Sequence, residues 1–130
     1  MRWFVPIERI RNQAQRFVAS LQAVVVLLLR KRLTRYSTVG VDEFPDELRP
    51  RVLYIAGEGE NVWAASLICP CGCNQVIELN LLPQVRPRWR VVQHADGTAT
   101  LDPSVWRKGG CRSHFFLTDG LIHWCRSNRT

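Results

Sequence analysis

Two short cysteine-containing segments constrain this chain of 130 residues more than any other feature. The first reads Cys-Pro-Cys-Gly-Cys at residues 69–73, and the second reads Cys-Arg-Ser-His at residues 111–114. Thiolates and imidazoles are common ligands of tetrahedral zinc, with Zn–S distances of about 2.3 Å. In an extended strand, residues two apart are separated by about 6.6 Å, so a straight segment could not place three thiols on one ion. Pro70 and Gly72 allow the backbone to curl, and the two segments together predict one zinc site.

The ligand set has more candidates than a tetrahedral zinc ion can accept. Five side chains compete for four places, namely Cys69, Cys71, Cys73, Cys111 and His114. If four thiolates bind the ion, the histidine is free for proton transfer; if one thiol turns away, the histidine completes the site. It cannot do both, because a histidine whose lone pair is on zinc is not a general base. The fifth cysteine, Cys125, lies in an apolar run and is expected in the core. The alternative to a metal site is that all five cysteines are small buried side chains that bind no ion.

The positive charge of the chain lies in its first quarter. Residues 1–35 contain eight basic residues and one acidic residue, which accounts for the whole formal charge of +7, and residues 36–130 contain ten of each. Apolar side chains recur at intervals of three and four over residues 7–35, which predicts an amphipathic helix. Such a helix fits the surface of an anionic membrane. It also fits packing on its own domain or on a partner protein.

Residues 1–35 are not expected to be a signal peptide or to contain a membrane-spanning segment. The chain has no apolar run of 18 residues, and Arg30, Lys31 and Arg32 follow the apolar segment where a signal peptide would need a small-residue cleavage site. Association of the helix with a membrane surface, without crossing it, stays an open alternative.

The rest of the chain alternates short β-rich runs with turn residues. The predicted strands cover residues 51–56, 61–68, 75–82, 88–94, 98–101, 114–118 and 121–125. Asp-Gly pairs at residues 96–97 and 119–120 predict two-residue hairpin turns. The sequence thus predicts an α+β protein with a helical arm over residues 1–36, a linker over 37–50 and a small, mostly antiparallel, zinc-stapled β domain over 51–130. Four tryptophans are expected to fill its core, namely Trp63, Trp89, Trp106 and Trp124.

A wider set of segments carries a resemblance to a known family. They are the two cysteine segments, Ile-Glu-Leu-Asn-Leu-Leu at 77–82, Trp89, Asp-Gly-Thr at 96–98, Leu-Asp-Pro-Ser-Val-Trp at 101–106, and Gly120 with Trp124. In these segments the chain resembles small bacterial proteins encoded beside ubiquitin-like conjugation genes, often in phage-defence operons. The resemblance implies a cytoplasmic zinc-binding protein whose partners are a ubiquitin-like protein and its conjugation enzymes. Where the family usually has a third glycine after the cysteines, this chain has Asn74.

Such a pathway needs a peptidase, and the matched segments contain candidate catalytic groups. Peptide hydrolysis uses a nucleophile, a base within hydrogen-bond reach and a group that orients the base. The candidate nucleophiles are Ser104 and Ser113, the candidate base is His114, and the candidate orienting acid is Asp102. Adjacent residues of a strand point to opposite faces, so Ser113 and His114 are not expected to pair. We therefore favour Ser104, whose loop could cross to the histidine from a neighbouring element.

The leading hypothesis is a zinc-stabilised, serine-type peptidase, similar to a deubiquitinase, that processes or removes a bacterial ubiquitin-like protein. An open zinc site with Glu58 or Glu60 as the base of a bound water fits less well, because thiolate-rich zinc sites are usually closed and structural. One alternative function is a non-catalytic zinc adaptor in the same pathway. Another is a nucleic-acid-binding zinc ribbon that uses the basic side chains of residues 86–112, but the balanced charge beyond residue 35 argues against it.

Overall fold

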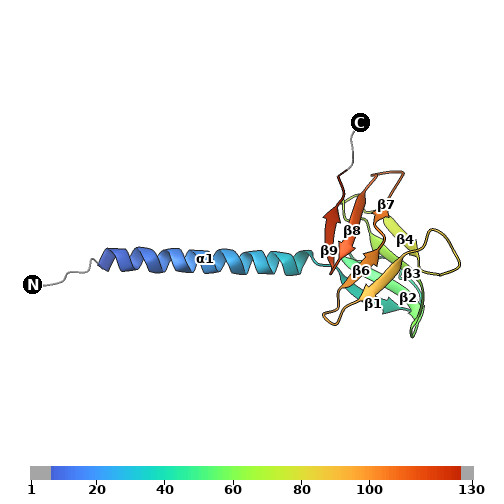
Figure 1. Cartoon of the computed structure of the whole chain (residues 1–130), viewed down its shortest axis with the longest axis horizontal. Coiled ribbons are helices and arrows are strands. Elements are labelled where there is room, and N and C mark those ends of the chain that lie inside the picture. The colour runs from blue at the N-terminus through green and yellow to red at the C-terminus, as the bar shows by residue number, and fades with distance from the viewer. Residues whose placement is uncertain (1–6, 127–130) are drawn as a thin grey trace, which may run out of the picture. The chain divides into compact units, whose positions relative to one another are not determined.

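A computed structural model describes residues 7–126 of the chain, which divides into two compact units that meet between Thr34 and Arg35. The first unit consists of helix α1, Ile7–Thr34 (Figure 1). No glycine or proline interrupts it, and the hydroxyl of Thr34 donates to the carbonyl of Arg30 at 2.8 Å in its last turn. The helix predicted from the spacing of apolar residues is confirmed. Within residues 7–126, no helix combines the length and the apolar character that crossing a membrane requires.

The second unit is a β domain of three small sheets (Figure 1). Its described strands are β1 (Ser37–Val41), β2 (Val52–Glu58), β3 (Asn61–Ile68), β4 (Val76–Asn80), β5 (Arg90–Gln93), β6 (Ala99–Asp102), β7 (Val105–Trp106), β8 (His114–Thr118) and β9 (Leu121–Trp124). The sheets have the orders β1-β2-β3-β4, β5-β6 and β7-β8-β9. All pairs are antiparallel except β1 with β2, which is parallel. The predicted helix followed by a mostly antiparallel β domain is confirmed.

The prediction of a linker over residues 37–50 is wrong for its first five residues, because these form β1. The strand pairs with β2 in register from Ser37 opposite Val52 to Val41 opposite Ala56, and the amide of Thr38 donates to the carbonyl of Gly97 at 2.9 Å. Local sequence cannot reveal this pairing, since a parallel partner lies across a connection rather than a tight turn. The β domain therefore includes the residues from 35 onward rather than from 51.

The two Asp-Gly pairs behave differently. Asp119 and Gly120 have φ angles of 51° and 77° and join β8 to β9 directly, so the predicted two-residue turn is confirmed there. At residues 96–97 only the glycine has a positive φ, of 82°. The carboxylate of Asp96 instead accepts hydrogen bonds from the amide and hydroxyl of Thr98, at 3.0 and 2.6 Å, which makes an Asx turn in a longer loop.

One core joins the three sheets. Its most deeply buried side chains include Leu53 of β2, Leu67 of β3, Leu79 of β4, Leu101 of β6, and Phe115 and Leu117 of β8. Burial alternates along β4, β6 and β8, whereas successive residues of β2 are buried from Val52 to Ala56. The prediction that four tryptophans fill this core is wrong for three of them, because Trp63, Trp106 and Trp124 are 40%, 59% and 53% exposed. Trp89 packs against the core, and the largely exposed ring of Trp124 contacts the buried ring of Phe115 edge-on, with centroids 5.7 Å apart. In β7, Val105 takes the inward position, so the next side chain, Trp106, faces outward.

Candidate functional site

The first cysteine segment forms a tight turn between β3 and β4. The amide of Cys69 donates to the carbonyl of Gln75 at 2.8 Å, which closes the turn around the other cysteines. Gly72 and Asn74 adopt left-handed φ angles of 94° and 59°. Asparagine tolerates this conformation better than other residues with a side chain, so Asn74 can replace the family's third glycine without straightening the turn. This backbone is the curl that the proline and glycine of the segment predict.

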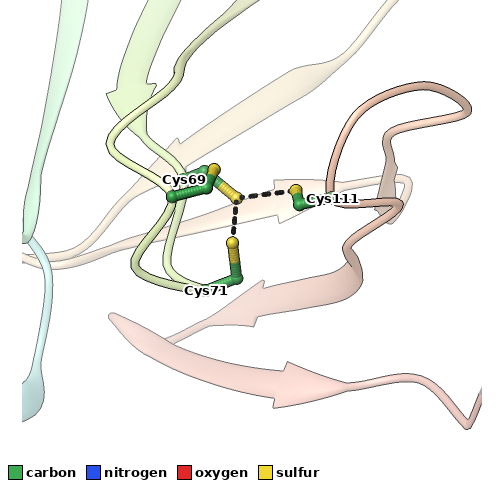
Figure 2. A group of neighbouring side chains, drawn as sticks. Cys69, Cys71 and Cys111 are labelled. Carbon is green, nitrogen blue, oxygen red and sulfur yellow. Dashed lines mark hydrogen bonds between the residues drawn. The ribbon is translucent and has the colours of Figure 1, made fainter.

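The second segment, between β7 and β8, brings Cys111 to this turn (Figure 2). The sulfur of Cys69 lies 3.4 Å from that of Cys71 and 3.6 Å from that of Cys111. With Cys73 included, the four sulfur atoms lie within 4.8 Å of one another. A tetrahedral ion with bonds of about 2.3 Å to sulfur requires sulfurs about 3.8 Å apart, so this group fits a metal ion such as zinc. We call these four residues the cysteine cluster. His114, the fifth candidate ligand, does not belong to this group.

Two neighbouring side chains supply hydrogen bonds to the cysteine cluster. The hydroxyl of Ser113 is buried and lies 3.4 Å from the sulfur of Cys69 and 3.1 Å from that of Cys111. The guanidinium of Arg107 donates to the sulfurs of Cys111 and Cys73, at 3.1 and 3.5 Å. Hydrogen bonding from Ser113 lowers the pKa of Cys111 to about 5, whereas burial raises the pKa of Cys69 to about 11. Ser113 thus favours the thiolate form of Cys111, which is the form that binds metals.

Outside the cysteine cluster, Ser104 and His114 form a hydrogen-bonded pair. The hydroxyl of Ser104 lies 3.0 Å from Nε2 of His114, and both side chains are half-buried and thus reachable from solvent. The strand register explains the pairing. Trp106 lies opposite His114 across β7 and β8, and Ser104, two residues earlier, points to the same face of the sheet. The two functional side chains are therefore diagonal neighbours on the outward face.

Three further contacts hold this pair in place. The ring of Trp106 stacks on that of His114, with centroids 5.1 Å apart and an interplanar angle of 17°. The indole nitrogen of Trp89 donates to the carbonyl of Ser104 at 3.3 Å. The amide of Cys125 donates to the carbonyl of His114 at 2.9 Å. Sequence reasoning missed both tryptophan contacts, since they depend on β7, a strand of two residues with no periodicity of its own.

The acids near the matched segments have other partners. The carboxylate of Asp102 pairs with Arg90 at 2.9 Å, and that of Asp119 with His94 at 3.1 Å. Within residues 7–126, no carboxylate lies at ion-pair distance from His114. Glu58 ends β2, opposite Asn61 in the hairpin, and the cysteine cluster includes no carboxylate from the described residues. Ser104 thus pairs with His114, and Ser113 contacts the thiols. Asp102 pairs with Arg90 and does not reach His114.

The site thus consists of four grouped thiols and, on one sheet face, a serine hydrogen-bonded to a histidine, which is the pair of groups that serine-type hydrolases use. Residues 40–125 match the family described as the bacterial ubiquitination-like system serine protease (BubE), and the chain belongs to this family. The match covers more than half of the chain and includes the cysteine cluster and the Ser104–His114 pair. No curated protein and no solved structure matches the chain.

Proposed function

We propose that this protein is a serine-type peptidase that processes or removes a bacterial ubiquitin-like protein, with Ser104 as nucleophile and His114 as general base. The observation that carries the proposal is the 3.0 Å contact between the hydroxyl of Ser104 and Nε2 of His114. This distance suits direct proton transfer. The family's description as a serine protease of a ubiquitination-like system supports the same reaction class.

In the proposed reaction, Nε2 of His114 accepts the hydroxyl proton while the oxygen of Ser104 attacks the carbonyl carbon of the scissile bond. The same nitrogen then donates the proton to the departing amine, which leaves an ester on the serine. Water hydrolyses this ester by the reverse exchange of protons through the histidine. The carboxylate released is the new C-terminus of the ubiquitin-like protein.

A base also needs an orienting contact, and here we assign that role to an aromatic ring instead of an acid. The ring of Trp106 lies against the imidazole at 17°, which fixes the plane of His114 relative to Ser104. Asp102, the acid expected from the sequence, is committed to Arg90. Trp106 is thus a positioning residue in this proposal.

We assign zinc to the cysteine cluster, bound by Cys69, Cys71, Cys73 and Cys111. Four thiolate ligands make a closed site whose contribution is structural, because no coordination position is left for substrate or water. Ser113 hydrogen-bonds to two of these thiols and so supports the metal site rather than acting as a nucleophile. His114 is then left free to carry the proton.

The pathway context extends the proposal to partners and location. The substrate is the C-terminal tail of a ubiquitin-like protein, either as a precursor or joined to a target, and the conjugation enzymes are further partners, in a phage-defence pathway. Cysteines that remain free thiols are typical of the cytoplasm. We further propose that α1 attaches the enzyme to an anionic membrane surface, because it exposes large apolar side chains within a strongly basic segment.

The test is cleavage of the ubiquitin-like precursor encoded beside this protein, using the purified, zinc-loaded full chain. Cleavage after the C-terminal glycine is expected, together with covalent labelling of Ser104 by a fluorophosphonate probe. Substitution of His114 by alanine should abolish the labelling while zinc content and melting temperature stay near those of the wild type. Absence of both cleavage and labelling would contradict the peptidase and favour a non-catalytic zinc adaptor.

A further inference from the structure

A basic pocket lies directly before the proposed nucleophile in the fold. It has a volume of about 280 Å³ and is lined by Arg86, Arg88, Arg90, Asp102 and Pro103. We call it the arginine pocket. Its last lining residue is the immediate neighbour of Ser104 in the chain. Three guanidiniums against one carboxylate leave the pocket with a formal charge of +2.

The excess charge belongs to Arg86 and Arg88. Arg90 is neutralised by Asp102 at 2.9 Å, but among residues 7–126 no carboxylate lies at ion-pair distance from the other two guanidiniums. Arg86 donates to the carbonyl of Pro83 at 2.8 Å, and Arg88 donates through Nε to the carbonyl of Leu81 at 3.3 Å. Each guanidinium carries five N–H donors, so most of them remain available to a ligand.

The loop that carries these arginines has a defined conformation. The side-chain amide of Asn80 donates to the carbonyls of Val85 and Pro87, at 3.0 and 3.1 Å, and its oxygen accepts from the amide of Leu82 at 3.1 Å. One asparagine therefore holds the loop from both of its sides. A positively charged pocket on such a preorganised loop loses little conformational entropy when it binds a ligand.

The same loop is joined to the catalytic pair. Trp89 stands between two of the pocket arginines, and its indole nitrogen donates to the carbonyl of Ser104 at 3.3 Å. From the other side, Asp102 reaches the pocket from the end of β6, two residues before that serine. The pocket and the nucleophile thus share a framework, since Pro103 lines the pocket and Ser104 follows it in the chain.

We infer that the arginine pocket is a substrate subsite that binds a carboxylate side chain of the peptide near its scissile bond. The inference rests on the proposed peptidase function and adds a specificity to it: the enzyme selects an acidic residue close to the cleaved bond. Guanidinium groups pair with carboxylates through parallel hydrogen bonds, which gives both affinity and orientation. The pocket's volume suits one or two side chains and not a folded surface.

The basic side chains further along the chain do not extend this pocket into a nucleic-acid surface. Arg107 donates to the thiols of the cysteine cluster, and Lys108 lies over the ring of Trp106 at 5.6 Å from its centroid. Both are engaged at other places in the β domain. They therefore do not continue the charge of the arginine pocket, whereas a nucleic-acid surface usually presents a continuous row of phosphate contacts.

The test uses internally quenched peptides based on the C-terminal tail of the ubiquitin-like substrate. At each position flanking the scissile bond, one peptide carries Glu and its partner carries the isosteric Gln. The full-length wild type should cleave the Glu peptide about tenfold better or more at one or more positions, mainly through a lower KM, since a charge-assisted hydrogen bond contributes that much. The variant with Arg86→Gln and Arg88→Gln should cleave both peptides of the pair equally, at the rate at which the wild type cleaves the Gln peptide.

Two controls separate the subsite from a general effect of charge or folding. Arg49→Gln removes an exposed arginine that does not line the pocket and should keep the full preference for Glu. Arg88→Glu makes the pocket formally neutral and should abolish the preference for the Glu peptide. Equal cleavage of Glu and Gln peptides by the wild type would overturn the subsite and leave the peptidase standing, whereas absence of any cleavage would overturn both. A single-stranded RNA that binds the wild type but not the double variant, without any Glu preference in cleavage, would assign the arginines to nucleic acid instead.

Discussion

The hydroxyl of Ser113 lies 3.1 Å from the sulfur of Cys111 and is buried, although the next side chain in the sequence, His114, faces the opposite way toward Ser104. One strand end therefore serves two sites at once. His114, the proposed base, lies on one face, and Ser113, which contacts the cysteine cluster, lies on the other, because successive side chains of a strand alternate between faces. The amide of Arg107 donates to the carbonyl of Ser113 at 2.8 Å and ties this strand end to β7. The cysteine cluster and the Ser104–His114 pair are thus linked through a few covalent bonds.

Removal of the proposed zinc should consequently inactivate the proposed peptidase without altering Ser104 or His114. The substitution Cys111→Ser is expected to lower bound zinc from one ion per chain and to destabilise the β domain by about 3 to 5 kcal/mol, as loss of a structural metal site does. Metal content by mass spectrometry and chemical denaturation measure the two effects. Cys125→Ser is the matched control, because Cys125 lies outside the cysteine cluster. An unchanged melting curve after chelation would contradict the metal site.

The two serines should separate in a kinetic comparison. Ser104→Ala is expected to lower kcat by about 10³-fold or more, since the proposed nucleophile is removed. Ser113→Ala should keep kcat within about tenfold of the wild type and weaken zinc binding, because the hydroxyl that contacts two thiols is lost. Rates on the ubiquitin-like precursor and zinc affinity by competition with a chelating dye give the readouts. The reverse result, with Ser113→Ala inactive and Ser104→Ala active, would exchange the roles of the two residues.

Local sequence signals were sufficient for the elements with their own periodicity or composition. The spacing of apolar residues predicts α1, and alternation and turn residues predict most of the strands. The spacing of thiols, together with the curl permitted by Pro70 and Gly72, predicts one metal site shared by the two cysteine segments but leaves five candidate ligands for four places. The structure groups the four cysteines. Strand alternation alone also separates Ser113 from His114.

The remaining features depend on contacts between distant segments. Strand β1 exists through its parallel pairing with β2, and β7 is only two residues long and is defined by pairing with β8. The stacking of Trp106 on His114 follows from that second register, so no reading of either segment alone could reveal it. The expectation that Trp106 is a core residue failed for the same reason, because Val105 already occupies the inward position.

The stacked ring should matter for catalysis more than for stability. Trp106 is 59% exposed, so Trp106→Ala removes little buried surface. It does remove the stacked indole ring, and the imidazole of His114 is then free to rotate about its side-chain bonds. We expect kcat to fall about 10- to 100-fold with KM nearly unchanged, and Trp106→Phe to restore most of the rate because it keeps an aromatic face. The control Trp63→Ala removes a tryptophan that is also exposed, from β3, and should leave kcat unchanged. Equal losses in both variants would contradict a positioning role.

The hairpin glycine, Gly120, should be more sensitive to substitution than the glycine of the other Asp-Gly pair, Gly97. Gly120 has a φ of +77°, and a Cβ there would lie 2.8 Å from the carbonyl oxygen of Tyr36 and 2.9 Å from Cγ2 of Thr98. Gly120→Ala combines backbone strain with a clash against backbone, so we expect a loss of about 3 kcal/mol in the free energy of unfolding. At Gly97 the φ is +82° but no atom lies within 4 Å of the added Cβ, so Gly97→Ala should cost only about 1 kcal/mol. Urea denaturation measures both, and similar losses would show that the close approach at Gly120 is unimportant.

The proposed attachment of α1 to membranes can be tested on the full chain with lipid vesicles. The helix exposes Phe17, Leu21 and Val24 on one apolar stripe, at 74%, 56% and 51%, and residues 1–35 supply the whole formal charge of +7. We therefore expect co-sedimentation with vesicles that contain about 30% phosphatidylserine, weak binding to pure phosphatidylcholine, and loss of binding at high salt.

Substitutions on opposite faces of the helix distinguish insertion of the apolar stripe into lipid from a purely electrostatic attraction. Leu21→Glu places a carboxylate within the apolar stripe and should reduce binding at least tenfold. Asn12→Glu introduces the same charge on the opposite side of a helix with 3.6 residues per turn, and should reduce binding only about as much as one lost positive charge does. If both variants bind equally well, the apolar stripe does not enter the lipid. In that case the helix pairs with a protein, and the two variants should differ instead in the oligomeric state measured by light scattering.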